Sequence, residues 1–415
     1  MQPNIELLAP AGSFEALTAA IQAGANAVYF GVEQLNMRAR ATMNFLVDDM
    51  PEISKRCREK GVRTYLTLNT VIFDHDISLL QQIVTKAKQA NISAVIASDM
   101  AVIMHCTKAG IPVHISTQLN ITNIEAVKFY AQFADVMVLA RELSLRQMKA
   151  ICSAIEKQQV TGPSGKIVQI EVFAHGALCM AVSGKCYLSL HTKNASANRG
   201  ACVQNCRRKY KVVDIEDGHE LEIDNEYIMS PKDLCTIEFL DHLLATGVSV
   251  LKIEGRGKSA DYVYTTTACY REAIEAVKDG SYSAAKVQGW MNRLEQVYNR
   301  GFWGGYYLGK QLGEWTHASG SIATQKKIYI GKGNHYYPKR GIAEFKIESY
   351  DLRKGDKVLI IGPTTGVLET TIETLHVNDD GAKDVAVKGD LCAFAVTQAV
   401  RTTDKLYKLV VAGAE

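Results

Sequence analysis

The chain has 415 residues, of which 47% are hydrophobic and 22% are charged, and its formal net charge is +3 at pH 7. This balance is typical of folded globular proteins and excludes a chain that is disordered over most of its length. The length exceeds that of one ordinary domain, so we expect one large domain and one small domain. The small net charge neither favours nor excludes a nucleic-acid partner.

The sequence lacks the features of an exported or membrane-inserted protein. No run approaches the roughly 18 apolar residues that span a bilayer, and the first residues lack the basic patch and apolar stretch of a signal peptide. We therefore expect a cytoplasmic protein with no membrane contact. In a reducing compartment, clustered cysteines are more often metal ligands or redox groups than disulfides.

Short apolar runs rich in β-branched residues alternate with segments of helical period, beginning at Ile5 and at Phe14. Repeated β/α units imply a parallel sheet, and eight of them predict a (β/α)8 TIM-like barrel. An open doubly wound sheet is the alternative, but it normally carries a glycine-rich phosphate turn that Pro10-Ala-Gly12 does not match. The expected strands cover residues 5–12, 27–31, 63–69, 94–99, 113–120, 136–142, 170–175 and 250–254, and the clearest helices cover 14–23, 78–90, 123–132, 145–157, 260–278 and 284–298.

Two further segments extend this barrel. About residues 176–249 form an insertion far longer than a β/α unit needs, and insertions at this end of a barrel tend to be functional. From Lys327 the hydrophobic period changes to two, which predicts a small C-terminal β-barrel domain. A glycine-rich stretch near residues 301–320 is expected to connect the two parts. We place the catalytic domain at 1–325 and the C-terminal domain, a candidate for RNA contact, at 326–415.

Polar residues follow many of the expected strands, and the carboxyl ends of barrel strands form the active-site face. Arginine is suited to carboxylate ligands because its planar guanidinium donates two parallel hydrogen bonds, although a salt bridge to Glu142 or Glu254 is an equally simple role. His175 and Glu254 are candidates for proton transfer, the latter if burial raises its pKa. The candidates for catalysis are His175, Glu254, Arg141, Arg256 and Lys252, and those for binding a co-substrate are Arg38, Arg40, Asn69 and Gln118.

Four cysteines in the insertion, Cys179, Cys186, Cys202 and Cys206, have the spacing C-x6-C-x15-C-x3-C. Four thiolates suit either an iron–sulfur cluster or a tetrahedral zinc ion. The spacing matches neither a zinc ribbon nor a ferredoxin, which favours a cluster of unusual type. Cys235 is either a further ligand or a neighbour of the site, and the others are expected to be small buried hydrophobes: Cys57, Cys106, Cys152, Cys269 and Cys392.

Several segments resemble the collagenase-like peptidase family of unassigned catalytic type, over nearly the whole chain, and are most similar to its prephenate-dependent tRNA hydroxylation proteins. These segments are Glu6–Gly12, Ala27–Gly31, Arg38–Arg40, His175–Cys179, Ser183–Cys186, Asn198–Gly200 and Lys252–Arg256. The resemblance implies a [4Fe–4S] cluster on Cys179, Cys186, Cys202 and Cys206. It also implies hydroxylation of a tRNA wobble uridine with prephenate as the hydroxyl donor.

Three functions follow from these observations: a tRNA hydroxylase, a cluster-dependent hydroxylase of a small molecule such as a quinone precursor, and a collagenase-like peptidase. The sequence contains no H-E-x-x-H or G-x-S-x-G motif, which disfavours a peptidase. The basic stretch Arg207–Lys211 is a candidate for phosphate contacts and base stacking, or a solvated basic strand. The oligomeric state does not follow from the sequence.

Overall fold

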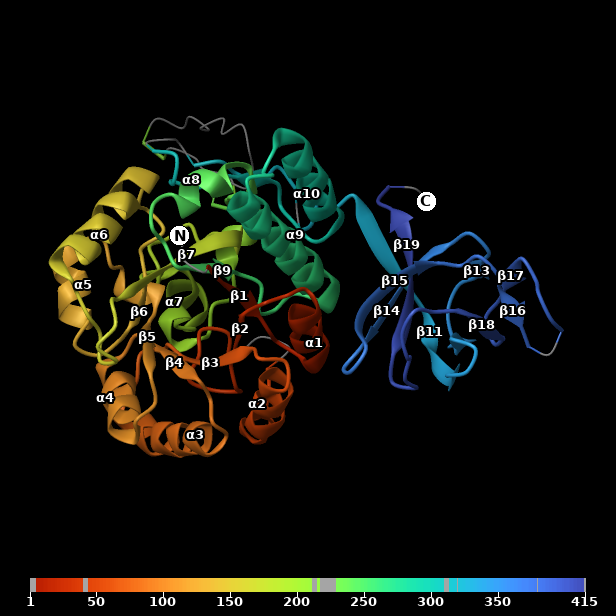
Figure 1. The fold of residues 1–415 in the computed structure, drawn as a ribbon, viewed down its shortest axis with the longest axis horizontal. Coiled ribbons are helices and arrows are strands. Elements are labelled where there is room, and N and C mark those ends of the chain that lie inside the picture. The colour runs from red at the N-terminus through yellow and green to blue at the C-terminus, as the bar shows by residue number, and fades with distance from the viewer. Residues whose placement is uncertain are drawn as a thin grey trace.

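The computed structural model describes residues 5–39, 44–210, 215–216, 229–309, 313–318, 320–378 and 380–413. Within these residues, eight parallel strands pair in the order β9-β1-β2-β3-β4-β5-β6-β7, and β7 pairs with β9 to close the ring (Figure 1). The predicted TIM-like barrel is confirmed, and each expected strand overlaps one of the ring. The strands are β1 (Glu6–Pro10), β2 (Ala27–Phe30), β3 (Arg63–Leu68), β4 (Ala94–Ala97), β5 (Val113–Ile115), β6 (Val136–Val138), β7 (Gln169–Ala177) and β9 (Val250–Ile253).

Helices surround the barrel and bury their apolar faces against it. Short polar residues begin several of them: Ser13 accepts a hydrogen bond from the backbone N–H of Ala16, and Ser144 forms a capping box with Gln147. Such caps mark the change from strand period to helical period in the sequence. The helices are α1 (Phe14–Gln22), α2 (Met50–Arg58), α3 (Ile77–Gln89), α4 (Met100–Ala109), α5 (Ile124–Tyr130), α6 (Leu145–Gln158), α9 (Ala260–Asp279) and α10 (Ala284–Gln296).

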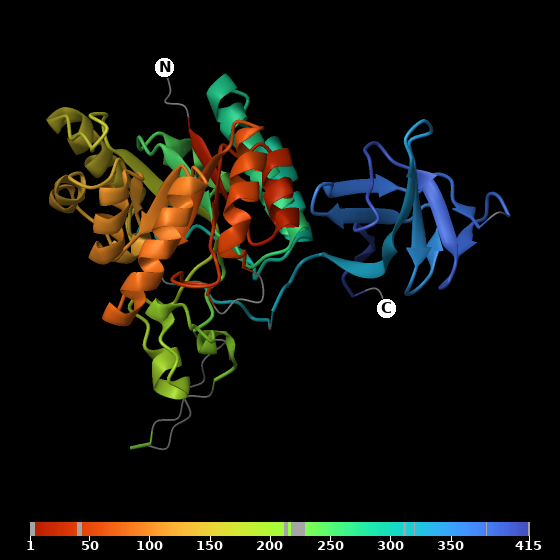
Figure 2. The ribbon, with the colours of Figure 1, turned by 90° about the horizontal axis from the view of Figure 1, so that it is seen from below.

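The insertion after β7 contains α7 (Leu188–Lys193), β8 (Asp233–Cys235) and α8 (Leu240–Leu244). The part around α7 projects away from the barrel in Figure 2. β8 returns antiparallel to β7, and β10 (Phe302–Trp303) pairs with β8. Part of the glycine-rich stretch that we expected as a connection is therefore packed on the barrel.

The C-terminal part consists of antiparallel sheets around their own core, in which Phe345 and Phe394 stack with ring centroids 5.2 Å apart. One sheet has the order β15-β14-β19-β11-β12-β18-β16, and β13 pairs with β17 in another. The strands are β11 (Gln325–Tyr337), β12 (Ile342–Ile347), β13 (Leu352–Arg353), β14 (Lys357–Gly362), β15 (Gly366–Thr371), β16 (His376–Val377), β17 (Val385–Ala386), β18 (Leu391–Ala395) and β19 (Lys405–Val411). That residues 326–415 form an independent domain stays a prediction.

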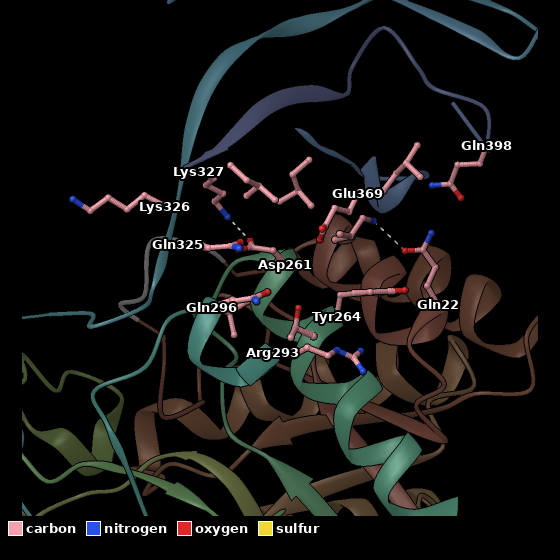
Figure 3. A pocket seen from close by; sticks show the side chains of 16 residues that line it. Gln22, Asp261, Tyr264, Arg293, Gln296, Gln325, Lys326, Lys327, Glu369 and Gln398 are labelled. Atoms are coloured by element: carbon pink, nitrogen blue, oxygen red, sulfur yellow. Dashed lines mark hydrogen bonds and ion pairs between the residues drawn. The ribbon is translucent and has the colours of Figure 1, made fainter. Parts of the chain in front are cut away.

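The C-terminal sheet lies beside α1 and α9. Ala19 and Ala260 on these helices form one buried cluster with Val367 and its neighbours. Gln22 donates to the carbonyl of Thr365 at 2.6 Å. A polar cavity of about 630 Å³ remains between the two parts (Figure 3). None of the described helices is long and apolar enough to cross a membrane.

Candidate functional site

Glu254, which directly follows β9, is the centre of a charged cluster at the carboxyl ends of the strands. Its Oε1 accepts a hydrogen bond from Arg38 Nη2 at 3.0 Å, and its Oε2 accepts one from the Tyr29 hydroxyl at 3.2 Å. Burial raises the pKa of this carboxyl, but the charges of Arg38, Arg141 and Arg256 outweigh burial and hold the pKa below its usual range. Our expectation of a raised pKa was therefore wrong, and Glu254 is an ionised acceptor at neutral pH.

Arg256 is buried beneath this cluster, with 5% of its surface exposed. Its Nη1 donates to the Thr67 hydroxyl, and burial lowers the pKa of the guanidinium to about 10, so that it stays charged at neutral pH. Gly31 makes room for it, because a Cβ at Gly31 would lie 2.8 Å from Asn36 Cγ and still closer to Arg256 Nη1. The buried Nε of Arg256 has no hydrogen-bond partner within the described residues.

Arg141 approaches Glu254 from the end of β6. Its guanidinium lies over the Phe173 ring, 3.8 Å from the centroid, and its Nη1 donates to the carbonyl of Ala177 at 3.1 Å. As with Arg256, its buried Nε finds no acceptor in the described part of the chain. Three guanidiniums therefore surround one carboxylate, which leaves an excess of positive charge for an anionic ligand.

Lys252 lies one layer deeper inside the barrel. Its Nζ forms an ion pair with Glu171 at 2.7 Å, and the two side chains are 6% and 0% exposed. The ammonium also lies 4.7 Å from the centroid of the Tyr29 ring. The structure thus places Lys252 in the barrel interior and not on the strand-end face where we expected it.

His175 points away from the strand-end cluster because of a bulge in β7. Phe173 pairs with Lys252 but His175 pairs with Ile253, so one extra residue turns the imidazole outward. Aromatic rings surround it, and it is 2% exposed. Burial lowers its pKa to about 4, so the imidazole is neutral at pH 7. This position does not support proton transfer at the cluster.

Asn69 and Gln118 support the loops of the site. Asn69 Oδ1 accepts from the backbone N–H of Met37 at 3.3 Å, next to Arg38. Gln118 Oε1 accepts from the Ser98 hydroxyl at 3.1 Å, and the Gln118 side chain lies against Gly184 of the cysteine segment. Both side chains are therefore engaged in contacts within the protein. Arg40, the remaining candidate for co-substrate binding, lies outside the described residues.

The four cysteines of the insertion are partly or fully exposed, unlike the other cysteines of the chain. Burial raises the pKa of Cys206, and the nearby thiols of Cys179, Cys202 and Cys186 raise it further. Cys206 is therefore electrostatically coupled to each of the other three cysteines. Within the described residues, no group of three or more His, Cys, Asp or Glu side chains has the geometry for a metal ion.

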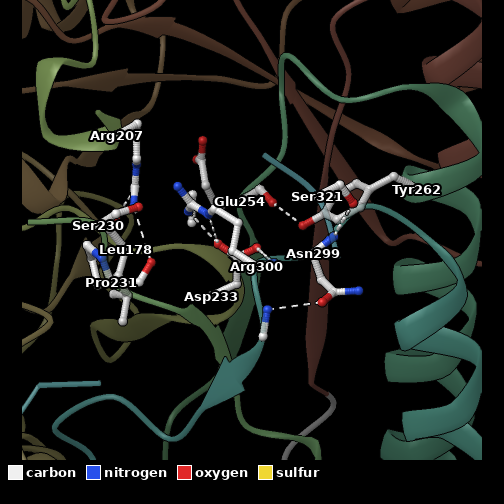
Figure 4. A network of polar contacts seen from close by, with 12 residues as sticks. Leu178, Arg207, Ser230, Pro231, Asp233, Glu254, Tyr262, Asn299, Arg300 and Ser321 are labelled. Atoms are coloured by element: carbon white, nitrogen blue, oxygen red, sulfur yellow. Dashed lines mark hydrogen bonds and ion pairs between the residues drawn. The ribbon is translucent and has the colours of Figure 1, made fainter. Parts of the chain in front are cut away.

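Arg207 anchors this segment to the barrel (Figure 4). Its guanidinium donates to the carbonyl of Leu178 at 2.6 Å, and to the Ser230 hydroxyl and the carbonyl of Pro231 at 3.1 Å each. Burial lowers its pKa. Arg207 is thus not part of an open phosphate-binding patch, whereas Arg208 and Lys209 are exposed. Lys211, the last residue of that predicted patch, lies outside the described residues.

Cys235 is a buried packing residue, with its thiol 3.8 Å from the Tyr270 hydroxyl and from Met291 Sδ. Burial raises its pKa to about 12. Of the two roles that we left open for Cys235, the structure supports that of a neighbour behind the site. The isolated cysteines that we expected to be hydrophobic are buried too: Cys57, Cys106, Cys152, Cys269 and Cys392.

Sequence reasoning missed a second polar network beside the cluster. Arg300 Nε donates to Asp233 Oδ1 at 3.0 Å, and both side chains are buried (Figure 4). Lys258 lies over the Tyr298 ring, 2.9 Å from its centroid, and burial lowers the pKa of its ammonium to about 7. Lys258 is only two residues after Arg256, so a wider search for polar residues after β9 would have included it. Arg300 is far away in sequence and carries no such signal.

Comparison with known proteins places these features in context. Residues 12–317 match the family described as Peptidase family U32. A protein of Porphyromonas gingivalis named "Collagenase" is 54% identical over 405 residues, which are 98% of each chain. The "tRNA hydroxylation protein P1" of Bacillus subtilis is 30% identical over 388 residues, 92% of this chain and 89% of that protein. The "23S rRNA 5-hydroxycytidine C2501 synthase" of Escherichia coli is 35% identical over 275 residues, 66% of this chain and 40% of that protein.

Proposed function

Since the chain belongs to peptidase family U32, we propose that it is an enzyme that hydroxylates a tRNA uridine in the cytoplasm. Its relatives include proteins named for RNA hydroxylation as well as proteins named for collagen cleavage. One observation carries the proposal: three arginines around the Glu254 carboxylate lie beside four cysteine thiols at the carboxyl ends of the barrel strands. Glu254 is the main cause that raises the pKa of Arg38, and Cys202 raises it as well. Arg38 is therefore coupled electrostatically both to the carboxylate and to the cysteines.

The four thiols suit a [4Fe–4S] cluster, which we propose as the resident cofactor. Thiolate is the usual protein ligand of such clusters, and Cys179, Cys186, Cys202 and Cys206 supply four. A four-iron cluster is larger than a single ion and needs its four sulfurs farther apart, so the absence of single-ion geometry within the described residues does not conflict with this proposal. Bound there, a cluster would supply electron transfer. Arg207 would hold the segment that bears it in place.

The arginine cluster suits a dicarboxylate, and prephenate is the hydroxyl donor that we propose. Three positive groups, Arg38, Arg141 and Arg256, face one negative group, Glu254, so the site has an excess of two positive charges. Two carboxylates would neutralise that excess. The unpartnered Nε atom of Arg256 is available as a donor to them.

A collagenase is the second candidate, and the observation in its favour is the 54% identity to a protein of that name. Against it, the imidazole of His175 is enclosed by Tyr262, Tyr270 and Phe302 and is 2% exposed, which leaves no room for a peptide substrate beside it. Hydroxylation of a small molecule is the third candidate, with the same cluster and the same arginines.

Nucleoside analysis of a deletion strain tests the proposal. We expect its tRNA to lack 5-hydroxyuridine, and a plasmid copy of the gene to restore it, while 5-hydroxycytidine in ribosomal RNA stays unchanged. Loss of 5-hydroxycytidine from ribosomal RNA, with 5-hydroxyuridine in tRNA unchanged, would show that the substrate is ribosomal RNA. Unchanged tRNA together with collagen cleavage by the purified protein would instead support the peptidase.

A further inference from the structure

A small cavity lies beside Cys179, at the edge of the arginine cluster. Its walls include Arg141 and Glu142 from the end of β6 and three aromatic side chains, Trp303, Tyr306 and Trp315. Two features hold these aromatics on the barrel: Trp303 pairs with Leu234 of β8, and Trp315 forms a bridge with Pro231. Trp303 and Tyr306 contact each other edge to face, with centroids 5.4 Å apart.

Two buried nitrogen atoms of residues that line this cavity have no hydrogen-bond partner within the described residues, and a third lining residue carries an exposed carboxylate. Trp303 is 6% exposed, and its Nε1 has no acceptor within the described residues. The buried Nε of Arg141 also has no acceptor within the described residues. The Glu142 side chain is exposed and makes no hydrogen bond or ion pair within the described part of the chain. Buried donors without acceptors are rare in folded proteins, and a ligand is one way to satisfy them.

We propose that this cavity receives the uracil ring of the RNA substrate, an inference that rests on the proposed function. The pairing edge of uracil carries two acceptors, O2 and O4, on either side of one donor, the N3–H. The cavity offers two donors, on Trp303 and Arg141, and one acceptor, the Glu142 carboxylate. Tyr306 and Trp315 supply aromatic faces of the kind on which unpaired RNA bases stack.

This chemistry discriminates between pyrimidines. Cytosine has an acceptor at N3, so the Glu142 carboxylate would face a lone pair where uracil offers a proton. Cytosine therefore loses the hydrogen bond that uracil N3–H donates to the carboxylate, and its N3 lone pair is repelled by the carboxylate charge. Glu142 is therefore the residue that we expect to select uridine over cytidine, and Trp303 and Arg141 are positioning residues for the ring.

The cavity must widen to admit a base, since its volume is about 30 Å³, that of roughly one water molecule. Met180 also lines it and is 48% exposed. An unbranched methionine side chain changes rotamer readily, so displacement of Met180 is the movement that we expect on entry.

Tryptophan fluorescence offers a direct test, because two of the three tryptophans in the chain, Trp303 and Trp315, line the cavity. The probe is an anticodon stem-loop RNA with either uridine or cytidine at the wobble position, added to the full-length protein. We expect quenching by both RNAs, with the uridine form bound at least about tenfold more tightly. Trp290→Phe removes the remaining tryptophan, which lies on α10, and should leave this difference unchanged.

Glu142→Gln should reduce the preference for uridine to less than about threefold, because an amide can donate to cytosine N3 as well as accept from uracil. Glu156→Gln, an exposed change on α6, is the matched control. Trp303→Phe should weaken binding of the uridine form, and thermal melting separates this effect from misfolding. Because Glu142 is exposed, we expect Glu142→Gln to fold normally. It therefore still tests the inference if Trp303→Phe does not fold.

The outcomes separate this inference from the proposed function. If both variants restored 5-hydroxyuridine in the deletion strain as well as wild type and kept the wild-type preference for the uridine RNA, the cavity would not be the base site, although the enzyme would be a tRNA hydroxylase. If the protein bound the uridine RNA more tightly than the cytidine RNA but hydroxylated no tRNA, the assignment of the base site would be supported and the proposed reaction would be wrong. Quenching by prephenate with no response to RNA would assign the cavity to the co-substrate and overturn the inference.

Discussion

Arg256→Lys tests the arginine cluster most sharply. Lysine keeps the positive charge next to Glu254 but replaces the planar guanidinium by a single ammonium group, so two-point binding of a carboxylate is lost. The contact to the Thr67 hydroxyl and the unpartnered Nε disappear together. The fold should change little, because the site stays positive and the shorter side chain introduces no collision with Gly31.

The magnitude follows from the hydrogen bonds. A hydrogen bond to a charged group contributes about 1.5–3 kcal/mol, which corresponds to about 10- to 150-fold in affinity. We therefore expect the KM for prephenate to rise by that factor, with a smaller change in kcat. The assay is hydroxylation of unmodified tRNA by the anaerobically purified protein at increasing prephenate concentrations, with 5-hydroxyuridine measured by mass spectrometry.

Arg353→Lys is the matched control, since Arg353 forms an exposed ion pair with Asp351 in the C-terminal part. It should change neither KM nor the melting temperature. An unchanged KM in Arg256→Lys would refute the role of this arginine in binding the co-substrate. A loss of activity that only followed a loss of folded protein would refute it equally.

Three further changes test the structure itself. Gly31→Ala should destabilise the protein by about 1–3 kcal/mol because the added methyl group overlaps Arg256, and thermal denaturation should show a lower Tm. Lys252→Met leaves the buried carboxylate of Glu171 unpaired and should cost about 3–5 kcal/mol in urea denaturation, and a smaller loss would show that water reaches this layer. The pKa of His175 is about 4 in the folded protein, which is lower than in the unfolded chain. The folded state therefore loses stability as the pH falls below the pKa of the unfolded chain. His175→Phe should flatten that loss in melting curves between roughly pH 6.5 and pH 4, and parallel curves for both proteins would contradict the buried, neutral imidazole.

The barrel could be predicted from the sequence because its signals are local. Strands buried on both faces read as short apolar runs, and polar caps such as Ser13 and Ser144 mark where the helices begin. The four clustered cysteines were equally visible, since their spacing lies within one segment.

The direction of individual side chains could not be predicted, because it depends on contacts far apart in sequence. One extra residue in β7 turns His175 outward, and Glu171 on a neighbouring strand holds Lys252 in the interior. Likewise, the pKa of Glu254 is lowered by Arg38 and Arg141, which are far away in the sequence, together with Arg256. Burial alone predicts the opposite direction.

The most direct test of the central claim is conversion of tRNA by the purified protein. Wild-type protein, prepared without oxygen and incubated with unmodified tRNA and prephenate, should contain iron and form 5-hydroxyuridine. A variant with Cys179, Cys186, Cys202 and Cys206 all replaced by alanine should do neither, whereas Cys392→Ala, at a buried site in the C-terminal core, should do both. Equal formation of 5-hydroxyuridine by the quadruple variant, or none by iron-loaded wild-type protein, would contradict the account.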